Sequence, residues 1–146
     1  MSEKRKIEEE ISKLYAQINT LNSIAEALKN QSETIQKQLI DMQLSIDTIN
    51  EISKMEKGHK VLLPLGSSIL IDAIVADNEN SYINVGANVI IKKSNNDVKT
   101  ILENRMENLQ RQQLEVQKRL NETLNSIEYL QGQLNTLIQQ ASEKKG

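Results

Sequence analysis

Between residues 7 and 53 the chain repeats every seven residues, with apolar side chains spaced alternately four and three apart. The two core positions of this heptad are occupied by Ile7, Ile11, Leu14, Ile18, Leu21, Ala25, Leu28, Ser32, Ile35, Leu39, Met42, Ile46, Ile49 and Ser53. Twelve of these fourteen residues are apolar. A period of 3.5 residues kept over this length predicts a coiled-coil helix, because an ordinary helix of 3.6 residues per turn would drift off the line.

A second heptad stretch occupies the end of the chain. Its core positions are Leu102, Met106, Leu109, Gln113, Val116, Leu120, Thr123, Ile127, Leu130, Leu134, Leu137 and Ala141, of which ten are apolar. The segment 94–97 offers several N-cap residues just before it, and Gly58 after two lysines is a suitable stop for the first helix. The polar residues Ser32, Gln113 and Thr123 either fix the register of the coil or loosen it.

Between the two coils, over residues 60–93, the apolar period changes from 3.5 to 2, which is typical of strands. The apolar runs are 61–63, ending at Pro64, 69–76, 82–85 and 89–91. Turn-forming residues separate them at 65–67, 77–80 and 86–88. We therefore expect four short strands that form two consecutive β-hairpins.

Helices of matching length on either side of a compact connector are expected to fold back on each other. The predicted fold class is mainly α with small β: a long antiparallel two-helix coiled coil joined by two β-hairpins. We expect one structural domain overall, with a first coiled-coil helix at 1–57, the hairpins at 58–94 and a second coiled-coil helix at 95–146.

Four strands are too few to close a barrel, so the hairpins have unpaired edges that favour association with other chains. The residues expected to form this oligomerisation surface are Leu62, Leu63, Ile69, Ile71, Ile74, Val75, Ile83, Val85, Val89 and Ile91. The alternative is a monomer in which the hairpins pack against the base of the coil.

Composition excludes several classes of protein. The 146 residues have a formal net charge of −2, and three Tyr are the only aromatic residues. The chain has no Cys and one His, so we expect no disulfide, no metal site, no cofactor and no thiol chemistry. No constellation of catalytic side chains is evident, and we expect the protein not to be an enzyme; His59 has no nucleophile near it in sequence.

Membrane and nucleic-acid partners are not expected either. The longest apolar run, at 69–71, is far shorter than a membrane span, and the first residues are charged rather than those of a signal sequence. We therefore expect a cytoplasmic protein. A near-neutral charge without basic blocks or Phe and Trp gives no footprint for nucleic acid.

The order of these elements resembles the prefoldin family, specifically the alpha class of archaeal type. The specific match lies in residues 61–93, above all in the Pro-Leu-Gly turn at 64–66 and the Asn-Val-Gly-Ala segment at 84–87. Two hairpins also distinguish the alpha class from the beta class, which has one.

The resemblance implies a chaperone that acts without ATP. Two alpha-class and four beta-class subunits would assemble through a β-barrel platform, hold unfolded client polypeptides at the coil tips and pass them to a group II chaperonin. Nothing in the chain resembles a Gly-rich phosphate-binding loop, which agrees with ATP independence.

The free ends of an antiparallel coil have neighbours on one side only, so apolar residues near them are the candidates for client binding. They are Ile7, Ile11, Leu14, Tyr15, Leu130, Leu134, Leu137 and Ile138. Tyr15 and Ile138 lie beside the core positions and are expected to stay exposed. For any single residue of this set, ordinary coiled-coil core packing is the favoured interpretation, because the heptad explains it without a client.

A different functional class stays open at this point. A coiled-coil scaffold or tether could associate through its β segment and use its arms only to set a distance. The capacity to hold non-native clients separates the two hypotheses.

Overall fold

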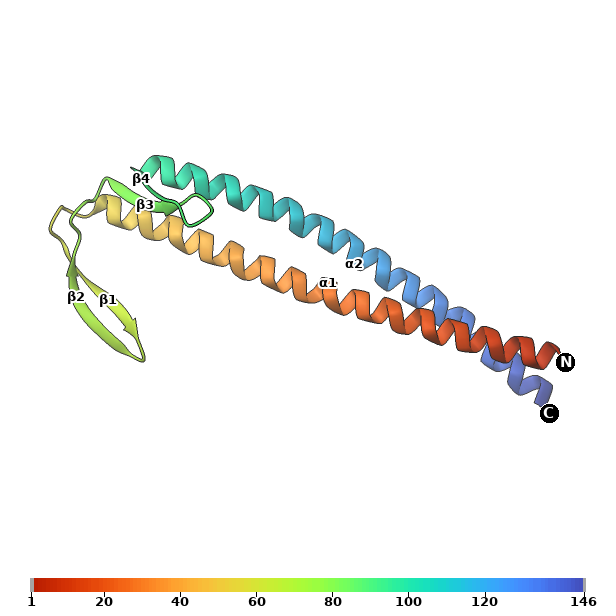
Figure 1. The fold of residues 1–146 in the computed structure, drawn as a ribbon. Helices are drawn as coiled ribbons and strands as arrows, with labels where there is room; N and C mark the ends of the chain where they lie inside the picture. The colour runs from red at the N-terminus through yellow and green to blue at the C-terminus, as the bar shows by residue number, and fades with distance from the viewer. Residues whose placement is uncertain (1, 146) are drawn as a thin grey trace. The chain divides into compact units, whose positions relative to one another are not determined.

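The computed structural model describes residues 2–145. The chain runs through helix α1 (Glu3–Lys54), strands β1 (Lys60–Gly66), β2 (Ile69–Ile74), β3 (Asn80–Asn84) and β4 (Ile90–Ser94), and helix α2 (Asn95–Lys145), as Figure 1 shows. The predicted fold class is confirmed in its elements: two long helices joined by two small antiparallel hairpins, β1–β2 and β3–β4.

The chain divides into two compact units. The helical unit comprises residues 1–36 and 111–146, and the hairpin unit comprises Lys37–Gln110. Both helices contribute to both units, since α1 and α2 are each continuous. Each unit has its own core.

In the helical unit the heptad positions form the core. Every described core position of the two predicted repeats in this unit is buried or half-buried, and Ala25, Leu28, Ile35 and Val116 are each only 4% exposed. The polar core residue Gln113 donates from Nε2 to the backbone oxygen of Ser32 at 3.2 Å. This bond links α1 to α2 at one defined register, the role that polar core positions play in other coiled coils.

In the hairpin unit a cluster of apolar side chains joins both helices to β3–β4. Its buried members are Ile46 of α1, Ile83 of β3, and Val98 and Leu102 of α2, with Val98 3% exposed. Ile91 of β4 packs against them from the strand opposite Ile83. The β3–β4 hairpin is therefore held on the helices by its apolar face.

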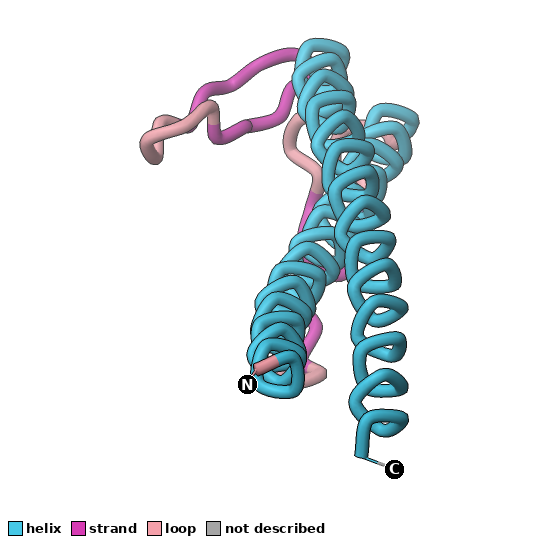
Figure 2. The backbone as a smooth tube through the Cα atoms, turned by 90° about the vertical axis from the view of Figure 1, so that its right-hand side faces the viewer, coloured by secondary structure: helices cyan, strands magenta, loops and turns pink. Residues whose placement is uncertain are grey.

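The β1–β2 hairpin has no such support. None of its residues is buried, and Figure 2 shows it standing away from the helices of the hairpin unit. Packing of the hairpins against the helices, which was the alternative expectation, is therefore seen for β3–β4 but not for β1–β2.

Two strand boundaries differ from those expected. Strand β1 continues through Pro64, which pairs with Leu70, and the register shifts between Pro64 and Gly66. A two-stranded hairpin has a free edge on each strand, so a residue without an N–H is tolerated there, and the irregularity follows it. Strand β2 ends at Ile74, two residues earlier than the apolar run suggested.

The start of helix α2 and the end of helix α1 each have a recognisable capping feature. The Ser94 hydroxyl accepts from the backbone N–H of Asp97 at 3.1 Å and so caps α2. At the other end, α1 stops at Lys54 and Gly58 adopts a left-handed backbone with φ of 91°. Both features agree with the sequence signals for helix start and stop.

Candidate functional sites

The β1–β2 hairpin is an apolar surface on both faces. One face carries Val61 and Leu63 opposite Ala73 and Ile71, without a charged residue. The other face carries Leu62, Pro64, Leu70 and Ile74 together with Lys60 and Asp72, whose side chains form an exposed ion pair at 3.4 Å. We call these the uncharged face and the ion-pair face.

Most of the residues predicted for oligomerisation are exposed, on the β1–β2 hairpin and in the connection between β3 and β4. The exposed ones are Leu62, Leu63, Ile69, Ile71, Ile74, Val85 and Val89, between 42% and 68% of their surface being accessible. Val75 is half-buried. Ile83 and Ile91 lie inside the chain's own cluster instead, where Ile83 is 8% exposed and has little surface left for another chain.

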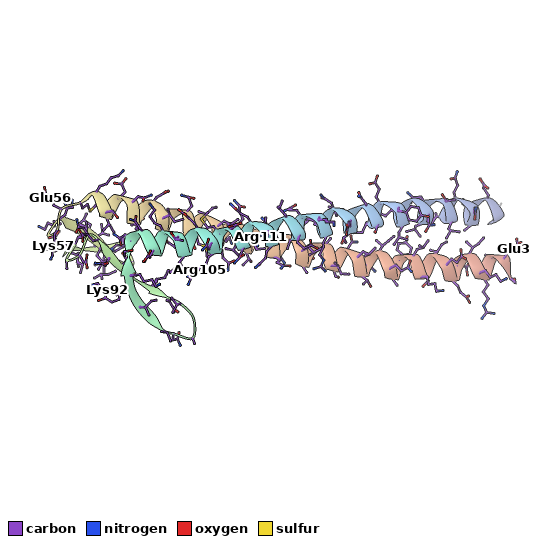
Figure 3. All side chains as sticks on the ribbon, turned by 90° about the horizontal axis from the view of Figure 1, so that it is seen from above. Glu3, Glu56, Lys57, Lys92, Arg105 and Arg111 are labelled. Atoms are coloured by element: carbon purple, nitrogen blue, oxygen red, sulfur yellow. The ribbon has the colours of Figure 1, made fainter. Side chains whose placement is uncertain are left out.

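The outer face of the β3–β4 hairpin is polar at its centre. Lys92 lies opposite Tyr82, with Nζ 5.7 Å from the centre of the ring, and Tyr82 is 70% exposed. Arg105 of α2 donates from its guanidinium to the backbone oxygen of Asn84 at 2.8 Å, and Lys92 and Arg105 both lie beside this hairpin in Figure 3. The hairpin is thus fixed to α2 by a polar contact as well as by Ile83.

The turn before β3 is organised by Asp77. Its Oδ1 accepts from the backbone N–H groups of Glu79 and Asn80 at 2.9 and 3.0 Å, and its Oδ2 lies 3.2 Å from Nζ of Lys92. The bond from Glu79, followed by those from Asn80 and Lys92, holds the pKa of the Asp77 carboxyl well below its ordinary value. The ionised carboxylate therefore favours the folded turn.

Replacing Asp77 by alanine is expected to lower the thermal stability of the protein in a pH-dependent way. Because the folded pKa is depressed, the contribution of Asp77 is complete above the unfolded value of 3.8 and is lost as the pH falls below it. The melting temperatures of variant and wild type should differ at about pH 7 and about pH 5 and converge toward about pH 2. An equal difference at all three pH values would contradict this account.

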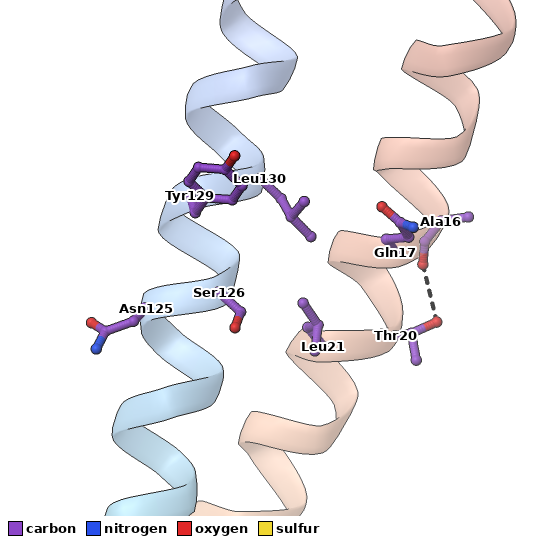
Figure 4. A pocket seen from close by; sticks show the side chains of 8 residues that line it. All are labelled: Ala16, Gln17, Thr20, Leu21, Asn125, Ser126, Tyr129 and Leu130. Atoms are coloured by element: carbon purple, nitrogen blue, oxygen red, sulfur yellow. Dashed lines mark hydrogen bonds between the residues drawn. The ribbon is translucent and has the colours of Figure 1, made fainter.

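Two adjoining grooves lie between α1 and α2 in the helical unit. The larger, about 750 Å³, is lined by Ala16, Gln17 and Leu21 of α1 and by Ser126, Tyr129 and Leu130 of α2, among others. Figure 4 shows Leu21 and Leu130 pointing toward each other from the two helices. The smaller groove, about 500 Å³, shares Gln17 and continues to Leu14 and Leu137.

The residues predicted for client binding divide into two groups in the structure. Tyr15 is 50% and Ile138 is 42% exposed, as expected for positions beside the core. The other six, Ile7, Ile11, Leu14, Leu130, Leu134 and Leu137, belong to the helix–helix core and are buried or half-buried. Of these six, Leu130 lines the larger groove, and Leu14 and Leu137 line the smaller one.

Sequence reasoning did not single out the larger groove. It missed Leu21, which had been assigned only to the core, and Tyr129, which is 67% exposed beside Leu130. A signal was present in the small residue Ser126, which lines the groove next to the core position Ile127. Which residues of the two helices face each other depends on the helix pairing, and one helix alone does not show that pairing.

Two kinds of feature are not found in the part of the chain that the structure describes. Within residues 2–145, no group of three His, Asp or Glu side chains is placed to hold a metal ion. In the same range no helix has a stretch long and apolar enough to cross a membrane.

Paired helices with two hairpins between them, one of which exposes apolar side chains on both faces, define a class of coiled-coil protein with a small β element at the connection between its helices. Comparison with known proteins identifies the family. The family model described as "Prefoldin subunit" matches residues 22–144. The chain belongs to the prefoldin family.

Curated relatives narrow the match to the alpha class. Prefoldin subunit alpha of Methanococcoides burtonii is 30% identical over 120 residues, covering 82% of this chain and 84% of the relative. Prefoldin subunit alpha of Methanopyrus kandleri is 25% identical over 123 residues, covering 82% and 78%. The resemblance to alpha-class prefoldin seen in the sequence is confirmed by these relatives.

A solved structure shares the fold. The cryo-EM structure of filamentous PFD from Methanocaldococcus jannaschii superimposes with a TM-score of 0.70 at 18% identity, covering 80% of this chain and 96% of that one. Family membership makes this protein a prefoldin-type chaperone subunit.

Proposed function

We propose that this protein is an ATP-independent holdase subunit, which binds non-native polypeptides through the helical unit and passes them to a group II chaperonin in the cytoplasm. The observation that carries the proposal is exposed apolar surface on the β1–β2 hairpin and, in the helical unit, beside the helix–helix core at Tyr15 and Ile138. A coiled coil that served only as a spacer gains nothing from the second patch.

The hairpin patch supports assembly with other prefoldin subunits, two of the alpha class with four of the beta class through a β-barrel platform. A free two-stranded hairpin with apolar side chains on both faces is marginally stable in water by itself. The hairpin would be stabilised if strands of other subunits paired with its edges and if those subunits covered both of its apolar faces. The prefoldin of M. jannaschii, described as filamentous, is a fold relative that assembles.

The holdase function is tested by aggregation of a chemically unfolded protein, for example citrate synthase diluted from guanidinium, followed by light scattering without nucleotide. We expect the wild-type assembly to suppress scattering. Tyr15→Ser combined with Ile138→Ser should require about tenfold more protein for the same effect, because burying one apolar side chain is worth ~1.5–3 kcal/mol and each assembly presents several copies.

The matched control is Ile40→Ser with Leu114→Ser. These two residues are also exposed apolar positions on α1 and α2, at 58% and 73%, but neither belongs to the predicted client-binding set. Unchanged suppression in the control and reduced suppression in the first variant support the proposal. A wild-type assembly that forms but does not suppress aggregation would favour the scaffold function instead.

A further inference from the structure

Charge is distributed very unevenly along the helical unit. Charged residues make up 26% of the chain, yet the stretches 14–25 and 123–142 together contain one, Glu128, among 32 residues. The other 31 are apolar, hydroxyl-bearing or amide residues and one glycine. We call these two stretches, which both belong to the helical unit, the uncharged collar.

The collar differs from the first turns of α1. Residues 3–13 contain eight charged side chains of both signs, so the free end of this helix is strongly hydrated. The change from charged to uncharged residues comes at Leu14. The smaller groove spans this change, because Glu10 and Lys13 line it together with Leu14. The larger groove is lined by neutral side chains alone.

The larger groove combines an apolar floor with free amides. Leu21 and Leu130 form the floor, and Gln17 and Asn125 lie among the lining residues. Within residues 2–145 the side-chain amides of Gln17 and Asn125 have no hydrogen-bond partner in the protein. A primary amide both donates and accepts, as the backbone of an extended peptide does.

The absence of charge around the groove selects its occupant. An ionised client side chain that entered the larger groove would lose water and find no opposite charge among the residues that line it, which is unfavourable. A neutral segment loses only weakly held water from its apolar side chain, and its backbone N–H and C=O groups find amide partners at the rim. The wall supplied by the exposed ring of Tyr129 favours an aliphatic or aromatic side chain.

We propose that the uncharged collar binds extended, uncharged segments of non-native chains, with one apolar side chain between Leu21 and Leu130 and the peptide backbone bonded to Gln17 and Asn125. This inference rests on the holdase function proposed above and specifies its client class. Segments rich in Ser, Asn, Gln and apolar residues are preferred over segments rich in Lys or Asp.

Three short fluorescent peptides test the proposal on the full-length protein. They share the same apolar residues, and the positions between them are filled with Ser and Gln, with Lys, or with Asp. By fluorescence anisotropy we expect the neutral peptide to bind about tenfold more tightly than either charged peptide. Its affinity should change less than about twofold between about 50 and about 500 mM salt, since no ion pair contributes.

Gln17→Lys with Asn125→Lys places cations in the collar without touching the helix–helix core. This variant should lose the preference for the neutral peptide and gain affinity for the Asp peptide at low salt. The matched control is Gln31→Lys with Gln112→Lys, at exposed positions of the same unit outside the collar, where Gln31 has the same heptad position as Gln17. The control should keep the neutral preference.

The outcomes separate this inference from the proposed function. Equal affinity for all three peptides, or a neutral preference that both lysine variants keep, overturns the collar as the binding site even when aggregation is still suppressed. Failure of the wild type to suppress aggregation, with the neutral preference intact and lost in the collar variant, refutes the holdase function and leaves the peptide specificity standing.

Discussion

Replacing Leu63 and Ile71 by glutamate is expected to dissociate the assembly of this protein while leaving its helices intact. The two residues pair directly across β1 and β2 on the uncharged face, and they are 47% and 42% exposed in the single chain. When another subunit covers this face, two carboxylates are buried without partners, which costs several kcal/mol. Sedimentation velocity or native mass spectrometry measures the mass, and circular dichroism measures the helix content.

Ile40→Glu provides the control for this experiment. Ile40 is 58% exposed and also belongs to the hairpin unit, but it lies on α1 rather than on a hairpin. The control should keep the mass of the wild type. An assembly that survives both glutamates on the uncharged face would show that β1–β2 is not the interface, and loss of assembly in the control would show that any new charge is disruptive.

Replacing Asn95 by alanine is expected to destabilise the hairpin unit by about 2–4 kcal/mol, because three hydrogen bonds of one buried side chain are lost at once and partly buried polar groups lose their partner. Asn95 is 5% exposed. Its Nδ2 donates to Ser53 Oγ at 3.0 Å and to the backbone oxygen of Asn78 at 2.8 Å, and its Oδ1 accepts from Ser81 Oγ at 2.6 Å. One side chain thus joins the end of α1, the turn before β3, β3 itself and the start of α2.

Urea unfolding of the full protein measures this loss, and amide hydrogen exchange shows where it falls. Exchange should accelerate in β3–β4 and at the adjoining helix ends, and much less in the helical unit. Asn96→Ala is the matched control, since Asn96 is the same residue type one position along and is exposed. If the urea concentration at the unfolding midpoint of Asn95→Ala equals that of Asn96→Ala within error, the role assigned to Asn95 is refuted.

Periodicity predicted the helices and their buried positions well. Of the predicted core positions in both repeats, Ser53 alone is exposed, and it is one of the few polar residues in that set. Its hydroxyl accepts from Asn95 instead of packing between the helices. The heptad works as a predictor because burial in a helix pair depends on local spacing that the sequence carries directly.

The candidate binding site was less predictable. Leu14, Leu130 and Leu137 were expected near the client-binding region and do line grooves, but Leu21, Gln17 and Tyr129 were not expected there. The groove is lined by residues of both helices, so its position depends on which turn of α1 faces which turn of α2. That pairing is a property of the folded unit.

The amino-acid sequence by itself determined two coiled-coil helices, four strands in two hairpins, and which helix face is buried, because each follows from a spacing of apolar residues along a single segment. The tertiary structure decided which of the two hairpins packs against the helices. In β3–β4, Ile83 and Ile91 form one apolar face against Val98 and Leu102, whereas β1–β2 is apolar on both faces and stays exposed. It also decided that Ser94 caps α2 while Asn95 is buried, since burial of a polar residue requires partners brought from distant parts of the chain.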